Sequence, residues 1–180
     1  MSTPDSEYIL GSSDREHERL IRQAVRIAPL TERFFREAGV GPGQRVLDVG
    51  SGMGDVAMLA GKLVGPAGEV LGVERDARSV ARARRRVAEA DYRNVSFSES
   101  DVAQISSNRP FDAVVGRFIL QFVPDPVAVL RSLSKLLRPA GAWPFRSRVG
   151  CLFFSFAASF RFGRPGAPSS TRPVRARECI

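Results

Sequence analysis

The stretch Asp48-Val49-Gly50-Ser51-Gly52-Met53-Gly54 decides the fold of this chain. It places three alternating glycines at the end of an apolar run, residues 45–49, that is expected to form a strand. Because glycine lacks a Cβ atom, the chain can turn sharply here and a ligand can come close to the backbone. The helix expected to follow presents unpaired N–H groups and the positive end of its dipole. The sequence therefore predicts a strand, a glycine loop and a helix that together cradle a nucleotide.

The spacing of the glycines narrows the choice of nucleotide. The dinucleotide fingerprint G-x-G-x-x-G requires its third glycine at position 55, where this chain has Asp55, and the third glycine is instead Gly54. A carboxylate at the helix entrance would repel a pyrophosphate, which disfavours a hydride-transferring dehydrogenase. It would not repel S-adenosylmethionine, which carries a sulfonium and no phosphate. A plain strand-to-helix turn that needs glycine only for its dihedral angles is the alternative.

The loop resembles motif I of the class I S-adenosylmethionine-dependent methyltransferases. The resemblance covers about residues 8–142 and includes Tyr8-Ile9-Leu10-Gly11, the segment GRFILQFVPDP at residues 116–126 and the turn LLRPAG at residues 136–141. That turn departs from the family's L-R-P-G-G pattern at Ala140. The resemblance implies an α/β fold with a Rossmann-like doubly wound parallel sheet, S-adenosylmethionine as cofactor and a small-molecule methyl acceptor.

Two acidic residues follow the next two expected strands. Glu74 comes twenty residues after Gly54, a spacing at which a carboxylate can accept hydrogen bonds from both ribose hydroxyls. In the family an acid after the third strand accepts from the adenine amino group, and here that position is Asp101, with the backbone N–H of Val102 facing the ring. The alternatives are a solvated acid at a strand end for Glu74 and a cap of a short helix for Asp101.

The resemblance also supplies a set of site residues. The loop glycines would hold the methionine portion of the cofactor, and Asp48 would hold the loop or bind the ammonium group. Arg75 and Asp76 also suit surface and helix-capping roles. Tyr8 and Phe118 are the candidates for the acceptor pocket. The candidate cofactor-binding residues are Asp48, Gly50, Ser51, Gly52, Gly54, Glu74, Arg75, Asp101, Val102 and Arg117.

No catalytic residue is singled out. Methyl transfer from a sulfonium draws its chemistry from the cofactor, and the protein supplies alignment and a dry pocket. A general base is needed only where the acceptor must lose a proton, so the sequence does not favour oxygen, nitrogen or carbon as the methylated atom.

Strands and helices alternate along the chain. This alternation predicts a parallel, doubly wound sheet preceded by two N-terminal helices, because Pro29 is expected to end the first and start the second. The expected strands are residues 45–49, 69–73, 95–98 and 111–116. The expected helices are about residues 13–28, 29–39, 55–64, 76–90 and 126–138.

The composition changes after residue 142. The predicted organisation is a methyltransferase domain over residues 1–142, with a helical cap at about 13–39 and a sheet core at 44–142, and a poorly ordered basic tail over 143–180. A fifth strand at residues 142–148 would contain Pro144, which cannot donate to a central ladder. We therefore expect a sheet that is incomplete at its C-terminal edge, or imperfectly covered there by residues 152–156, in a truncated or frame-shifted methyltransferase.

The charge of the chain suggests other functions. The net charge is +8 and the isoelectric point is near 10.8, and the tail holds seven arginines against Glu178 alone. A basic tail permits nucleic-acid binding, although its phenylalanines fall in an uncharged run rather than among the arginines, which makes that function the less favoured one. A noncatalytic fragment that retains the methyltransferase fold is the other alternative.

Several residue types argue against other kinds of site. The chain has two cysteines and one histidine, so no metal site is expected, and His17 is expected on the surface. Arg82, Arg84, Arg85 and Arg86 are expected to form a solvated helix face. The longest uncharged apolar run, residues 149–160, is shorter than the roughly 20 residues that span a bilayer, and the N-terminus does not read as a secretory leader. A cytoplasmic protein without membrane contact is expected, in an oligomeric state that the sequence leaves open.

Overall fold

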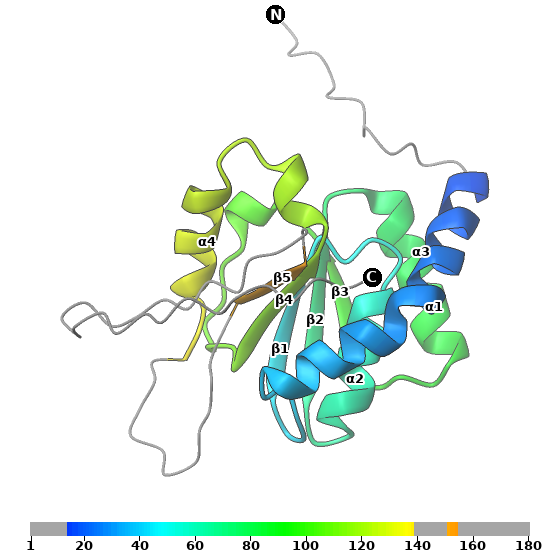
Figure 1. Cartoon of the computed structure of the whole chain (residues 1–180), viewed down its shortest axis with the longest axis horizontal. Helices are drawn as coiled ribbons and strands as arrows, with labels where there is room; N and C mark the ends of the chain where they lie inside the picture. The colour runs from blue at the N-terminus through cyan, green and yellow to red at the C-terminus, as the bar shows by residue number, and fades with distance from the viewer. Residues whose placement is uncertain (1–13, 139–150, 155–180) are drawn as a thin grey trace, which may run out of the picture.

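The computed structural model describes residues 14–138 and 151–154 as a sheet of five strands with helices on both faces (Figure 1). The strand order is β3-β2-β1-β4-β5, and all pairs are parallel. The predicted doubly wound parallel sheet is therefore confirmed. The strands are β1 (Arg45–Val49), β2 (Glu69–Glu74), β3 (Val95–Glu99), β4 (Ala113–Arg117) and β5 (Cys151–Phe154). The helices are α1 (Asp14–Glu37), α2 (Asp55–Val64), α3 (Ala77–Glu89), α4 (Pro126–Ser134) and the short 3₁₀ turns η1 (Val102–Gln104) and η2 (Ile119–Phe122).

The central strand β1 pairs with β2 on one side and β4 on the other. Val46, Leu47 and Val49 are fully buried, as expected for a strand covered on both faces. From β1 the chain proceeds outward to β2 and β3, and then returns across the sheet to β4. The strand order therefore reverses between β1 and β4, and the carboxyl ends of these strands form a topological switch point where ligands bind in open α/β sheets.

Two clusters of buried apolar side chains flank the sheet. Val46 points into the cluster formed with α1, α2 and α3, which includes Phe35 and Val80. Its neighbour Leu47 points into the other, which includes Leu133 of α4. The alternation follows from the two-residue period of a strand. Figure 1 shows α1, α2 and α3 grouped on one side of the sheet and α4 on the other.

The N-terminal cap is one helix, not two. Pro29 lies inside α1, so the prediction that it ends a helix is wrong. A proline removes the hydrogen bond to the carbonyl four residues earlier, here that of Val25, whose residue is 67% exposed and open to water. Ala24 and Phe35 are both buried on the same helix, and this packing on either side of Pro29 offsets the lost bond. Thr31 adds a side-chain hydrogen bond to the Ile27 carbonyl at 3.0 Å.

The fifth strand lies later in the chain than predicted. Residues 142–148, where that strand was expected, fall outside the described residues, and the strand that pairs with β4 is β5, in a register that joins Val114 to Cys151 and Arg117 to Phe154. The run Cys-Leu-Phe-Phe contains no proline, so its backbone can complete a ladder that Pro144 could not. Part of the predicted tail thus belongs to the sheet, while the rest of it is outside the described residues.

Most of the remaining boundaries follow the predicted ones, but α4 ends at Ser134, four residues before the predicted end at 138. α2 has the predicted bounds, and Asp76 caps α3 by accepting a hydrogen bond from the Ser79 N–H at 2.8 Å. β4 begins two residues later than predicted because Phe111 forms an isolated bridge to Leu137. Within the described ranges, none of the helices combines the length and apolar character needed to cross a membrane.

Candidate functional site

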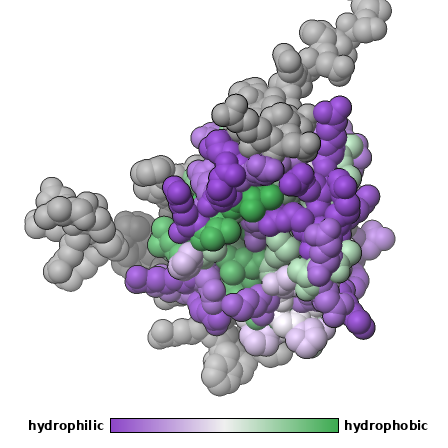
Figure 2. Space-filling model, turned by 90° about the vertical axis from the view of Figure 1, so that its right-hand side faces the viewer, coloured by the Kyte–Doolittle hydropathy of each residue, from purple (hydrophilic) through white to green (hydrophobic). Residues whose placement is uncertain are grey.

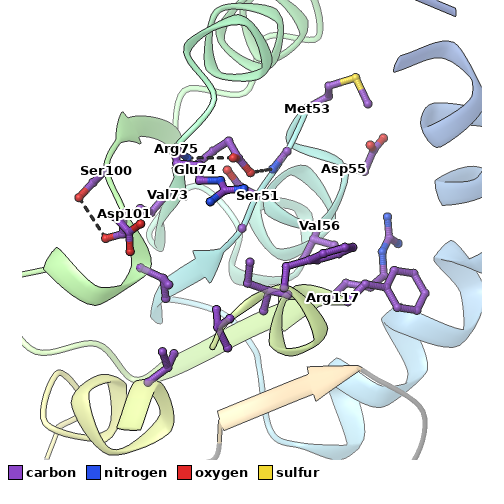
Figure 3. A pocket seen from close by; sticks show the side chains of 18 of the residues that line it. Ser51, Met53, Asp55, Val56, Val73, Glu74, Arg75, Ser100, Asp101 and Arg117 are labelled. Atoms are coloured by element: carbon purple, nitrogen blue, oxygen red, sulfur yellow. Dashed lines mark hydrogen bonds between the residues drawn. The ribbon is translucent and has the colours of Figure 1, made fainter. Parts of the chain in front are cut away.

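A cavity of about 250 Å³ opens at the carboxyl ends of the central strands (Figure 3). Its walls come from the glycine loop after β1, from the residues that follow β2, β3 and β4, and from Leu20 and Gln23 of α1. The cavity therefore lies at the switch point of the sheet. Of the predicted site residues, those that line it are Gly50, Ser51, Gly52, Glu74, Arg75, Asp101, Val102, Arg117 and Phe118.

Two glycines of the loop have different surroundings. Gly52 has φ +51° and lines the cavity, and a Cβ atom added there would meet nothing within 4 Å. Gly54 has φ +87°, and a Cβ atom there would lie 2.7 Å from the Phe97 ring. Gly54 does not line the cavity, and it lies at the start of α2 packed against Phe97. Gly52 leaves the open space that a ligand can fill.

Glu74 ties the loop to the end of β2. Its carboxylate accepts hydrogen bonds from the Gly52 N–H at 3.0 Å, the Arg75 N–H at 2.8 Å and the Asp76 N–H at 3.1 Å. The residue is 5% exposed, so it is not a solvated acid. Three accepted bonds leave capacity on the carboxylate for about one more donor, such as a ligand hydroxyl.

Asp101 both caps a short helix and lines the cavity. One carboxylate oxygen accepts a hydrogen bond from the Ala103 N–H at 2.8 Å and so caps η1. Asp101 and Val102 also line the cavity, at the end of the strand next to that of Glu74. Both acids therefore face the same space as the glycine loop (Figure 3).

Asp48 lies beneath the loop and does not line the cavity. It is fully buried, and neither carboxylate oxygen has a hydrogen-bond partner among the described residues. Its side chain follows Val46 onto the face of the sheet that α1 and α2 cover, because β1 alternates. Of the two roles predicted for Asp48, this position lies closer to holding the loop than to binding the ammonium group of the cofactor. Burial raises the pKa of Asp48 well above its ordinary value, and the positive charge of Arg117 opposes that shift.

One of the arginines expected on a solvated face fastens the loop instead. Arg86 of α3 donates to the Met53 carbonyl at 2.6 Å and to the Asp55 carboxylate at 2.8 Å. The side chains of Arg86 and Asp55 are only 21% and 17% exposed. Arg84 likewise donates to the Phe97 carbonyl at 2.9 Å. The solvated-face prediction is wrong for Arg86, because its long side chain reaches across from α3 to the loop, whereas Arg84 makes its bond and still lies on the exposed face.

The end of β4 brings a cation and a strained aromatic residue to the cavity. Burial lowers the pKa of the Arg117 guanidinium, and the carboxylates of Asp55 and Asp48 oppose this shift. Phe118, the next residue, has φ +64°, a left-handed conformation that is unusual for a bulky side chain. Phe118 lies in the cavity wall as predicted, whereas Tyr8 is outside the described residues.

His17 is buried rather than exposed, which corrects its predicted surface position. It is 4% exposed, and its Nε2 atom has no hydrogen-bond partner among the described residues. The neighbouring sequence looks polar, but Ala24 and Phe35 lie at helical spacing from His17 along the face of α1 that packs inward. Within residues 14–138, no group of three potential metal ligands is brought together.

Sequence reasoning found one part of the apolar wall of the cavity and missed another. The segment at residues 116–126, which resembles the lining of the methyl-transfer site in the family, supplies Ile119, Phe122 and Val123. A helical period could have placed Leu20 on an inward face of α1, but no local pattern indicates that this face reaches the ends of the strands. The missed apolar residues are Leu20, Met53, Val56, Val73, Ala103 and Val129.

Comparison with known proteins places this architecture in a family. A family model described as a methyltransferase domain matches residues 41–149. The chain is 32% identical over 130 residues to a ubiquinone biosynthesis O-methyltransferase of Albidiferax ferrireducens, covering 71% of this chain and 50% of that protein. It is 33% identical over 115 residues to a ubiquinone/menaquinone biosynthesis C-methyltransferase of Pseudomonas putida, covering 62% and 45%. The chain thus spans about half the length of these curated relatives.

A solved structure agrees with the sequence relatives. A SAM-dependent methyltransferase from Aquifex aeolicus superposes with a TM-score of 0.56 at 27% identity, over 61% of this chain and 58% of that one. The family model covers more than half of the chain, and the fold of the described residues agrees with it. The chain belongs to the methyltransferase domain family and has the fold of the class I S-adenosylmethionine-dependent methyltransferases.

Proposed function

We propose that the cavity binds S-adenosylmethionine and that the domain transfers its methyl group to a small-molecule acceptor. The observation that carries the proposal is the bond between the Glu74 carboxylate and the Gly52 N–H, which places an acid and an open glycine backbone in one cavity. Asp101 at the neighbouring strand end adds a second acid to the same wall. Two acceptors beside an open loop suit the hydroxyl and amino donors of an adenosyl group.

The charge of the loop favours a cationic ligand over a diphosphate. Asp55 stands in the first turn of α2, where a phosphate would otherwise bind, and its carboxylate is held there by Arg86. Glu74 is bonded to the loop from the other side. A pyrophosphate at this helix end would meet two carboxylates, whereas a sulfonium would be attracted to them.

The cavity wall supports the acceptor side of the proposal. When bound, S-adenosylmethionine would supply an activated methyl group that a nucleophilic atom can displace from sulfur. Phe118, Leu20 and Phe122 would exclude water from the reacting atoms and orient the acceptor. Relatives that methylate oxygen and carbon are both similar to this chain, so the proposal names a small molecule and no particular acceptor atom.

The proposal also includes the cellular setting and the domain boundaries. A cytoplasmic setting suits a chain with only two cysteines. Residues 1–142 and 143–180 are proposed as domain and tail, with residues 151–154 of the tail contributing β5.

Nucleic-acid binding through the tail is the less favoured alternative. A steep salt dependence of DNA or RNA binding that is lost on deleting residues 155–180 would support it.

Calorimetric titration of the full chain tests the cofactor. S-adenosylmethionine and S-adenosylhomocysteine are expected to bind, and NAD is not. Glu74→Gln is expected to weaken the binding of both adenosyl compounds by about tenfold or more, because a charge-assisted acceptor is lost from a buried position. Glu89→Gln, an exposed residue at the end of α3, is the matched control. Tighter binding of NAD than of S-adenosylhomocysteine, or no binding of either adenosyl compound, would contradict the proposal.

A radiolabel assay tests transfer itself. The full chain is incubated with S-adenosylmethionine labelled in the methyl group and a panel of phenols, amines and quinols. Label in any acceptor, at a rate that Glu74→Gln reduces and Glu89→Gln does not, supports the proposed reaction. Binding of the cofactor without transfer to any acceptor class would favour the noncatalytic alternative.

A further inference from the structure

Arg117 brings to the cavity a cation that has no bonded partner among the described residues. It is the last residue of β4 and lines the cavity on the same side as Asp55 (Figure 3). Among residues 14–138 and 151–154, none forms a hydrogen bond or a close ion pair with its guanidinium. A guanidinium carries five N–H donors in a planar fork, and none of those of Arg117 has an acceptor among the described residues.

The two nearest acids do not neutralise this cation. Asp55 and Asp48 are the carboxylates whose charges act on Arg117. The Asp55 carboxylate is already bonded to Arg86 at 2.8 Å. Asp48 is fully buried under the loop, and burial raises its pKa, which reduces the negative charge it offers. A partly buried cation with no bonded partner is costly, so the position of Arg117, unlike the glycine loop, favours an anionic group supplied by a ligand.

The cavity carries acceptors and donors at different strand ends, although Arg75 lies beside Glu74 and Asp55 lies on the side of Arg117. Glu74 ends β2 and Asp101 follows β3, whereas Arg117 ends β4 on the other side of β1. Neighbouring strands are about 4.8 Å apart, which puts the ends of β2 and β4 roughly 10 Å apart across the loop. A ligand that fills this span meets acceptors at one end and a donor fork at the other.

We propose that Arg117 binds a carboxylate of the ligand that occupies the cavity. The inference rests on the proposed function and adds the charge of the group held at the β4 end. A carboxylate matches the guanidinium fork with two parallel hydrogen bonds, and its single charge is tolerated beside Asp55 better than that of a phosphate. Two sources carry this chemistry, namely the amino-acid end of S-adenosylmethionine and an acid group on the methyl acceptor.

Two adenosyl compounds test whether the amino-acid end of S-adenosylmethionine supplies the carboxylate. S-adenosylhomocysteine carries the amino-acid carboxylate, and 5′-methylthioadenosine lacks it. We expect Arg117→Met to weaken the binding of S-adenosylhomocysteine by about tenfold or more and that of methylthioadenosine by less than about twofold. Arg117→Lys keeps the charge without the fork and is expected to fall between wild type and Arg117→Met. Arg131→Met, on the exposed side of α4, makes the same change of side chain away from the cavity and is the control.

A second arm tests the acceptor as the source. Benzoate and its neutral analogue benzamide are titrated into protein saturated with S-adenosylhomocysteine. If the acceptor supplies the carboxylate, Arg117→Met leaves S-adenosylhomocysteine binding unchanged and abolishes the preference for benzoate. Melting temperatures within about two degrees of wild type show that the variants fold.

The inference and the function on which it rests fail in different ways. Equal weakening of both adenosyl compounds, or no effect on either arm, would overturn the assignment of Arg117 while leaving cofactor binding intact. Failure of the wild-type chain to bind S-adenosylhomocysteine would overturn the proposed function and the inference together.

Discussion

The two sides of the cavity are built differently. On the side of β1 and β2, the loop is held within the chain, since Glu74 accepts the Gly52 N–H and Arg86 binds the Met53 carbonyl. On the side of β4, Arg117 has no bonded partner among the described residues and Phe118 holds a φ of +64°. Unused donors and backbone strain cluster where a ligand completes a site. A preorganised cofactor loop therefore faces a wall that is completed by its ligand.

The lining of the cavity fits this arrangement, since apolar side chains such as Ile119 and Val123 lie beside charged ones such as Glu74 and Arg117. Figure 2 shows an apolar strip enclosed by hydrophilic side chains on one face of the molecule. Polar groups that surround an apolar recess are typical of small-molecule sites, where a few directional contacts orient the ligand and the apolar walls exclude water.

The largest expected effect is on stability and comes from Gly54 in the loop after β1. Gly54→Val would force a β-branched residue to φ +87° with its Cβ atom 2.7 Å from the Phe97 ring. We expect the free energy of unfolding to fall by about 3 kcal/mol or more, since strain and overpacking add. Urea denaturation measures it. Gly52→Ala, which meets only open space, should cost about 1–2 kcal/mol in stability and mainly reduce cofactor affinity. Equal stability losses at the two glycines would contradict this distinction.

The next effect concerns the Arg86 clamp on the same side. Arg86→Met removes the donors to Met53 and Asp55 and leaves a carboxylate that is only 17% exposed. We expect a stability loss of about 1–3 kcal/mol and weaker binding of S-adenosylhomocysteine, because the loop loses its fixed shape. Arg85→Met on the exposed face of α3 is the control. Unchanged binding in Arg86→Met would show that the loop is held without the clamp.

The order of elements and the loop could be predicted from sequence because both are local. Glycine spacing and apolar runs indicated the bounds of β1 and α2, and the acids at the next strand ends followed from the topology of parallel strands. The features that sequence missed depend on contacts between distant residues. Arg86 reaches a carbonyl 33 positions away in sequence, and α1 continues through Pro29 because of what it packs against. Neither contact leaves a periodic signal.

A pH series tests how the buried Asp48 carboxyl affects the free energy of unfolding. Burial raises the pKa of Asp48 above its unfolded value, so the folded state binds more protons than the unfolded state between those two pKa values. The stability contributed by protonated Asp48 is full below the unfolded pKa and declines as the pH rises toward the folded pKa, with a slope of about 1.4 kcal/mol per pH unit. Asp48→Asn should remove this decline. Parallel urea titrations of both proteins from pH 4 to 8 measure it, and identical slopes would show that Asp48 is not the group responsible.

The smallest expected effect tests the strain on the β4 side. At Phe118, asparagine tolerates the left-handed conformation whereas valine resists it. Both substitutions remove the ring from the cavity wall, so their difference in unfolding free energy isolates the backbone, and we expect Phe118→Asn to be more stable than Phe118→Val by about 1 kcal/mol. Equal stabilities would mean that the turn relaxes out of φ +64° once the ring is gone. The strain would then come from the aromatic side chain against the cavity wall, and the β4 side would lose one of the two features that set it apart from the loop.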